Sequence, residues 1–106
     1  MAKYLLEVSY TAEGVKGLIK DGGTRRRKKV QELLKAAGGK LEAFYFAFGK
    51  HDAYVIADVP DNASAAALCL AVNSSGAVAI KTTVLLTPEE IDKASENSIS
   101  YSPPGQ

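Results

Sequence analysis

The spacing of apolar residues alternates between a strand period and a helix period in one fixed order, and this order restricts the fold more than any other feature of the chain. Residues 3–10 alternate apolar and polar side chains, which predicts a strand. Helical stripes follow between residues 15 and 37, with a break at Gly22-Gly23. The later segments predict further elements: strands over 41–48, 51–59 and 78–86, a helix over 63–72, and a short last helix.

Short capping signals indicate where the helices begin and end. Thr24 is expected to cap the second helical run with its side chain, and Gly38-Gly39 is expected to end that run. Thr87 and Pro88 are expected to begin the last helix, because a threonine cap followed by proline is a common helix start. Residues 98–106 are predicted to form an extended or mobile tail.

Strand-helix-strand-strand-helix-strand is the order of the split βαβ motif. It predicts an α+β, ferredoxin-like βαββαβ fold with a four-stranded antiparallel sheet. Right-handed crossovers place both helices on one face of that sheet. A chain of 106 residues is too short for two independent cores, so we expect a single domain over residues 1–97.

The predicted central hairpin, with a tight connection at residues 48–51, is apolar on both faces. One face is expected to carry Phe44, Phe46, Phe48, Tyr54 and Ile56, and the other Leu41, Ala43, Tyr45, Ala53, Val55 and Val59. Two helices cover only one face, so a monomer would leave an apolar sheet face in water. We therefore expect a homodimer or a higher oligomer.

Composition narrows the class of protein. The chain is 46% hydrophobic and 24% charged with a net charge of +1, which argues against a disordered chain and against charge-driven binding to membranes. No apolar run approaches the roughly 20 residues of a spanning helix, and no secretory signal pattern is seen. Cys69 is the single cysteine and lies in an apolar run, which predicts a small buried side chain. We expect a cytoplasmic protein.

Six stretches of the chain together carry a family resemblance. They are YLL at residues 4–6, SYTAEG at 9–14, GGKLE at 38–42, FYFAFGKHDAY at 44–54, PDN at 60–62 and KTTVLLTPEE at 81–90. With these stretches the chain resembles the GYD-domain family over roughly residues 3–95. The resemblance implies the fold of the dimeric α+β barrel proteins, in which two ferredoxin-like sheets face each other around a shared interior.

The resemblance implies less about function. The superfamily includes small oxygenases, isomerases and decarboxylase-like enzymes as well as ligand-sensing modules, and fold alone does not choose among them. The Gly-Tyr-Asp motif of the family reads Gly49-Lys50-His51-Asp52 in this chain. Any role of the motif tyrosine therefore does not carry over.

His51 and Asp52 are the candidate catalytic residues. Histidine is the side chain best suited to proton transfer near neutral pH, and a neighbouring carboxylate can orient it. Adjacent residues of a strand point to opposite faces, however, so these two side chains are expected to diverge. The alternative is a structural turn in which Asp52 accepts hydrogen bonds from backbone amides.

A ligand site is the second hypothesis. Asp52 and Tyr54 share a strand face, and Lys81 interrupts the apolar last strand. If that face lines the interior of a dimer, these groups would lie near Phe46, with Tyr10 at the rim, in an apolar pocket with few polar groups. The alternative is that Asp52 and Tyr54 pair at a subunit interface, while Lys81 reaches past the sheet edge.

The basic run at residues 25–29 follows a predicted helix start. Arg25 and Arg26 could hold an anion together with the free amides of the first turn, although a solvated basic face is the alternative. Nucleic-acid binding through this run is not expected. One histidine and one cysteine far apart in sequence argue against a structural zinc site, and no dinucleotide fingerprint is present. We expect neither a metal nor a cofactor.

Three functions fit these features. The first is binding of a small molecule in a pocket at the sheet. The second is a cofactor-independent enzyme of the oxygenase or isomerase kind, with His51 or Asp52 as base and Tyr54 or Lys81 polarising the substrate. The third is a structural or accessory oligomer. An enzyme predicts a hollow polar interior, whereas a structural role predicts an interior packed to normal density.

Overall fold

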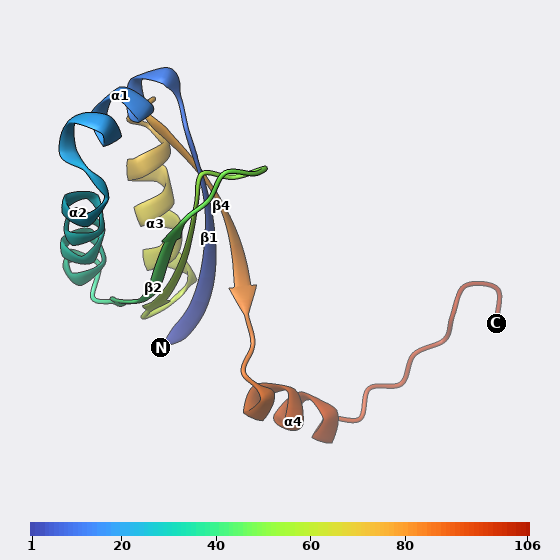
Figure 1. Ribbon diagram of the computed structural model, residues 1–106. Helices are drawn as coiled ribbons and strands as arrows, with labels where there is room; N and C mark the ends of the chain where they lie inside the picture. Colours follow the sequence, from blue (N-terminus) through green and yellow to red (C-terminus); the bar gives the residue numbers. More distant parts are fainter.

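The computed structural model describes residues 1–106 and contains four strands and four helices (Figure 1). The strands are β1 (Ala2–Tyr10), β2 (Lys40–Phe46), β3 (Ala53–Val59) and β4 (Val78–Leu85). The helices are α1 (Ala12–Asp21), α2 (Gly23–Ala36), α3 (Asn62–Asn73) and α4 (Pro88–Glu96). All strand pairs are antiparallel, and the sheet order is β2-β3-β1-β4. The predicted ferredoxin-like α+β arrangement is confirmed.

The fold has two layers. Helices α1, α2 and α3 lie on one face of the sheet, and no helix covers the other face (Figure 1). Alternation along β1 and β3 places every second side chain under the helices, where Leu34 of α2 and Leu68 of α3 meet them. The buried core consists of Tyr4, Leu6, Val8, Leu34, Ala53, Val55, Ala57, Val59, Ala65, Leu68 and Val78. Only 12 of the 106 residues are buried, so the core is thin for a chain of this length.

Helix α2 ends as predicted at Gly38-Gly39. Gly38 has a φ of 80°, its N–H donates to Lys35 O, and the Gly39 N–H donates to Leu34 O at 2.8 Å. These two bonds form a Schellman motif, which satisfies carbonyls that the helix end leaves free. A Cβ at position 39 would also collide with the backbone oxygen of Asp58, so the sharp return of the chain to the sheet requires glycine there.

The prediction that Thr24 caps α2 is wrong. The helix begins at Gly23, and its N-cap is Gly22, which has a φ of 82° and makes no side-chain capping bond. The Gly22 N–H also closes α1 by donating to Leu18 O at 2.7 Å. One left-handed glycine thus ends the first helix and begins the second, and it leaves no place for a separate capping residue.

The connection between β2 and β3 is longer than predicted. β2 ends at Phe46 and β3 begins at Ala53, so the ladder stops before the tight turn expected at residues 48–51. The Ala47 N–H donates to Asp52 O, and the Asp52 N–H donates to Val8 O, both at 2.8 Å. Residues 47–52 therefore form a loop that is closed by the bond between Ala47 and Asp52 and is fastened to β1 through Asp52.

The predicted distribution of aromatic residues over the two sheet faces is wrong for β2. Phe44 pairs with Val55, and Phe46 pairs with Ala53, so both phenylalanines belong to the helix side. A bulge between Leu41 and Ala43 adds one residue to β2, which keeps Leu41 on that side as well. The expected grouping of Phe44 and Phe46 with Tyr54 and Ile56 required a register that the loop length does not allow.

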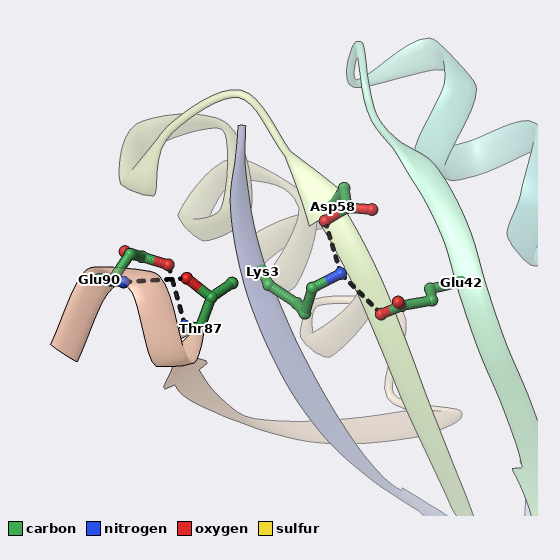
Figure 2. A network of polar contacts seen from close by, with 5 residues as sticks. All are labelled: Lys3, Glu42, Asp58, Thr87 and Glu90. Carbon is green, nitrogen blue, oxygen red and sulfur yellow. Dashed lines mark hydrogen bonds and ion pairs between the residues drawn. The ribbon is translucent and has the colours of Figure 1, made fainter. Parts of the chain in front are cut away.

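A network of ion pairs joins three strands of the sheet near the start of β1. Lys3 Nζ lies 2.7 Å from Glu42 Oε2 and 3.0 Å from Asp58 Oδ1, which joins β1 to β2 and β3 (Figure 2). The hydrogen bonds that Lys3 donates to Glu42 and, second, to Asp58 raise the pKa of Lys3 above its ordinary value. The bulge on β2 supplies this contact, because it places Glu42 at the end of the lysine side chain.

Two helices have side-chain caps of the ordinary kind. Asp61 Oδ1 accepts from the Ser64 N–H at 2.8 Å at the start of α3. At α4, Thr87 and Glu90 form a reciprocal capping box with Pro88 in the first turn (Figure 2). The predicted start of the last helix is confirmed. No helix in the structure has both the length and the apolar character that crossing a membrane requires.

The cap of α3 predicts a specific pH dependence. The Ser64 amide and hydroxyl lower the pKa of Asp61 below its ordinary value of 3.8, so the ionised carboxylate stabilises the fold. This stabilisation is complete above pH 3.8 and is lost as the pH falls through the lower folded-state pKa. We expect Asp61→Ala to lower the urea midpoint at pH 7, and the difference from wild type to shrink well below pH 3.8.

Asp61→Asn is the matched control, because its amide oxygen can still accept the Ser64 bond but does not titrate. The midpoint of this variant should stay near that of wild type at pH 7. An Asp61→Ala deficit of equal size at pH 7 and in strong acid would contradict the role of the charged cap.

Candidate functional site

The helix-free face of the sheet carries three cross-strand rows. Because directly paired residues share a face, the strand register defines each row. The rows, each ordered from β2 through β3 and β1 to β4, are Lys40, Asp58, Lys3 and Leu85; Ala43, Ile56, Leu5 and Thr83; and Tyr45, Tyr54, Glu7 and Lys81. The middle row is apolar apart from the threonine hydroxyl, and the third row places two tyrosines, a carboxylate and an ammonium group side by side.

His51 lies against the third row and is the one buried polar residue of the chain, with 6% of its surface exposed. Its Nε2 is 2.8 Å from Glu7 Oε2, and its Nδ1 is 3.2 Å from Ser9 Oγ. The ring also meets Tyr54 edge to face, with centroids 5.8 Å apart. We call these four residues, Glu7, Ser9, His51 and Tyr54, the His51 cluster.

The local backbone explains why His51 rather than Asp52 joins the cluster. Asp52 donates its N–H to Val8 O, and its Oδ2 accepts from the Tyr10 N–H at 2.7 Å. The carboxylate thereby continues the β3–β1 pairing beyond the end of the regular ladder, and its hydrogen bond is to the Tyr10 amide and not to Tyr54. His51 and Asp52 diverge as expected, and Asp52 makes the backbone contact of the structural alternative.

The partners of His51 indicate its tautomer. An ionised carboxylate only accepts hydrogen bonds, so the 2.8 Å contact with Glu7 places a proton on Nε2. In the neutral imidazole, Nδ1 is then free to accept the Ser9 hydroxyl. Glu7 thus orients the ring, and the ring presents a basic nitrogen to an O–H group. This is the arrangement of a general base held in place by an acid.

The other residues predicted for the ligand site divide between the two sides of the sheet. Tyr54 and Lys81 lie in the third row of the helix-free face, where Lys81 is exposed opposite Glu7. Tyr10 and Phe46 lie on the helix side, where Phe46 packs edge to face on Phe44 with centroids 5.0 Å apart. The structure therefore does not bring these four residues to one place.

Tyr10 lines a cleft of about 330 Å³ among α1, α2 and α3. Glu13, Asp21 and Arg26 also line it, so the cleft carries charges of both signs. Asp21 is already paired with Lys29 at 3.4 Å. Arg26 Nε is buried without a hydrogen-bond partner, but it has no surface from which a molecule in the cleft could reach it. Arg25 is exposed and does not line the cleft.

Sequence reasoning did not pair Glu7 and Ser9 with His51. Both residues alternate with the core residues of β1, which was a visible signal that they face away from the helices. What the sequence lacked was the position of the loop, because only the fastening of residues 47–52 to β1 carries His51 over these side chains. The structure contains no group of three or more His, Cys, Asp or Glu side chains placed to hold a metal ion.

The buried geometry of the cluster predicts measurable coupling. A double-mutant cycle of Glu7→Ala and His51→Ala should give an interaction energy of roughly 0.5–3 kcal/mol, because the two side chains are in direct contact and the Glu7 change leaves the buried His51 without one of its partners. Urea unfolding of the four proteins measures it.

Lys81 supplies the matched control, since it lies directly opposite Glu7 in the register but is exposed. The corresponding cycle of Glu7→Ala with Lys81→Ala should give a smaller value, within the roughly 0–1 kcal/mol that is usual for exposed charges. A His51 coupling no larger than the Lys81 coupling would show that the buried contact contributes nothing specific.

Comparison with known proteins agrees with the fold. None of the curated proteins compared with this chain matches it. The family described as the GYD domain matches residues 4–95, a range that includes the whole sheet except its first two residues and extends almost to the end of α4. The antiparallel order β2-β3-β1-β4 and the three covering helices fit the resemblance inferred from the motifs. The chain belongs to the GYD domain family.

Proposed function

We propose that the protein binds a small organic molecule between two copies of its sheet, at the His51 cluster. The observation that carries the proposal is His51 itself. The imidazole is buried and has a partner at each ring nitrogen, on a sheet face that no helix covers. A buried polar side chain is an informative exception in a small domain, and one on an open sheet face marks a place where a ligand could meet it.

The apolar surface that a single copy exposes on its helix-free face supports pairing of two sheets. The apolar row with Leu5 and Ile56 crosses the centre of the helix-free face, and Tyr45 beside it is 73% exposed. A thin core and a broad face of this kind are typical of a domain that buries more surface by association. A two-fold axis through this face would set one His51 cluster opposite the other, with the apolar rows in contact.

The chemistry of the face suggests what such an interior would hold. Tyrosine rings and the apolar row would contact the carbon skeleton of a ligand, while few polar groups would fix its orientation. Ser9 and Tyr54 offer hydroxyls that donate or accept hydrogen bonds, and Lys81 offers a cation opposite Glu7. We therefore expect a partly apolar molecule with a carbonyl, hydroxyl or carboxylate group.

Native mass spectrometry of the full chain as purified tests both parts of the proposal. The expected result is a dimer, or a multiple of it, that carries an adduct of reproducible mass. Leu5→Glu should give monomers, because it places a charge in the apolar row. His51→Gln should keep the dimer and lose the adduct.

Ile19→Glu is the control for added charge, since Ile19 is 78% exposed on α1, on the other side of the sheet from the helix-free face. It should change neither the oligomer nor the adduct. A monomeric wild-type protein, or an adduct that His51→Gln retains, would contradict the proposal. A dimer without any adduct would favour an accessory oligomer instead.

Proton-transfer catalysis is a second candidate function, and the Glu7–His51–Ser9 chain favours it. His51 would accept a proton from the bound molecule through the Ser9 hydroxyl, while Glu7 stabilises the charged imidazole. No cofactor is needed for such a step. Both candidate functions use the same site. They differ only in whether the bound molecule is chemically changed before it is released.

Hydrogen exchange distinguishes these two functions. The co-purified molecule is released and incubated with fresh protein in D₂O, and its mass is followed with time. An enzyme should introduce deuterium at carbon about 100-fold or more faster than His51→Gln does, the usual size of a general-base contribution. Equal rates for both proteins would leave binding as the function.

A further inference from the structure

The C-terminal segment of the chain makes a detached arm. Helix α4 and residues 97–106 project from the end of β4, away from both layers of the domain (Figure 1). The radius of gyration is 17.0 Å, against about 13 Å for a compact chain of this length. The longest dimension is 57 Å, nearly twice the next, which is 32 Å. The arm accounts for this elongation.

The sequence specifies α4 as a helix, although α4 packs on neither layer of the domain (Figure 1). α4 has nine residues, and isolated helices shorter than about 12–15 residues are marginal in water. Its capping box and Pro88 define its start, so the sequence specifies a helix at this place. Ile91 and Ala94 lie three residues apart on one face, and Ile91 is 50% exposed. A capped helix with one uncovered apolar face requires a docking surface.

A groove of matching character lies along the other side of the same strand. It has a volume of about 450 Å³ and separates α3 from β4 on the helix side of the sheet edge. Leu70 of α3 and Val84 of β4, both lining it, are 71% and 53% exposed. Ala65 and Ala66 form its floor with Cys69, and these small side chains let a helix approach closely. The groove is an unfilled position in the helix layer.

No residue of the arm lines the groove of its own chain. Only Leu86 and Thr87 separate β4 from α4, and Val84 of the groove lies shortly before them. Thr87 is extended, with φ −75° and ψ 158°, and its capping bonds hold that conformation. The helix so defined runs away from β4 and not back over it (Figure 1). A second copy can offer its groove to the arm as it stands.

We propose that α4 of one copy docks into the groove between α3 and β4 of a second copy, with Ile91 against Leu70 and Val84. In a symmetric pair both arms would be exchanged in the same way. The groove opens on the helix side of the sheet, opposite the His51 cluster, so this contact is independent of the sheet pairing proposed above.

Cys69 makes the proposal directly testable, because it lines the groove and is the only cysteine of the chain. Ile91→Cys is prepared in ¹⁴N- and ¹⁵N-labelled forms, mixed, and oxidised mildly. The expected product is a disulfide between position 91 of one copy and Cys69 of another, seen as a linked peptide pair of mixed label. Lys93→Cys, on the opposite face of α4, should form it about tenfold more slowly, because a disulfide needs Cα atoms within about 7 Å.

Two further variants separate docking from chance collision. Leu70→Glu in the Ile91→Cys background should reduce the mixed-label disulfide about tenfold, the effect of roughly 1.4 kcal/mol of lost binding. Ile19→Glu, an equal change at an exposed residue of α1, should leave it unchanged. A disulfide that joins position 91 to Cys69 of the same chain would overturn the proposal. So would a mixed-label yield equal for Ile91→Cys and Lys93→Cys.

Discussion

Strand β1 is the constraint on which the rest of the structure depends. It lies between β3 and β4, and both of its sides are paired. Its strict alternation sends Tyr4, Leu6 and Val8 into the core and Glu7 and Ser9 to the helix-free face. The same period of two therefore builds the hydrophobic layer and presents two of the partners of His51. A shift of one residue in this strand would exchange the core for the polar cluster.

The loop at residues 47–52 brings His51 onto this surface. Asp52 binds the backbone of β1 through both its amide and its carboxylate. These two hydrogen bonds continue the contact between β1 and the chain before the first residue of β3. His51 is thereby held over Glu7, which is far away in the chain. The family motif falls on this loop, so its aspartate has a physical role in fastening the loop to β1, while the residue before it contacts Glu7 and Ser9.

The domain is also unusual in how much apolar surface it leaves uncovered at three separate places. The helix-free face, the groove beside α3 and the arm at α4 each expose large side chains, among them Tyr45, Leu70 and Ile91. Hydrophobic free energy scales with area removed from water, so these surfaces favour association over a solitary chain. Sheet pairing and arm exchange would use opposite sides of the sheet, and an assembly could contain both contacts.

Most of the fold could be predicted from the sequence, because the signals that define it are local. Period-two and helical spacing located all the strands and helices, Gly38-Gly39 ended α2, and Thr87-Pro88 began α4. The order of these elements was enough for the sheet topology. One local signal, Thr24, predicted the wrong capping residue, because Gly22 with its positive φ occupies the N-cap position and the helix begins at Gly23.

The candidate site was decided by tertiary structure. The sequence by itself determined that His51 would lie at the end of a hairpin and that Glu7 and Ser9 would share a strand face. It did not determine the length of the loop or the bulge in β2, and these two features set which residues meet across strands. They moved Phe44 and Phe46 beneath the helices and left Tyr54 with His51. Register depends on contacts between residues distant in the chain, and the pattern of a single segment does not contain them.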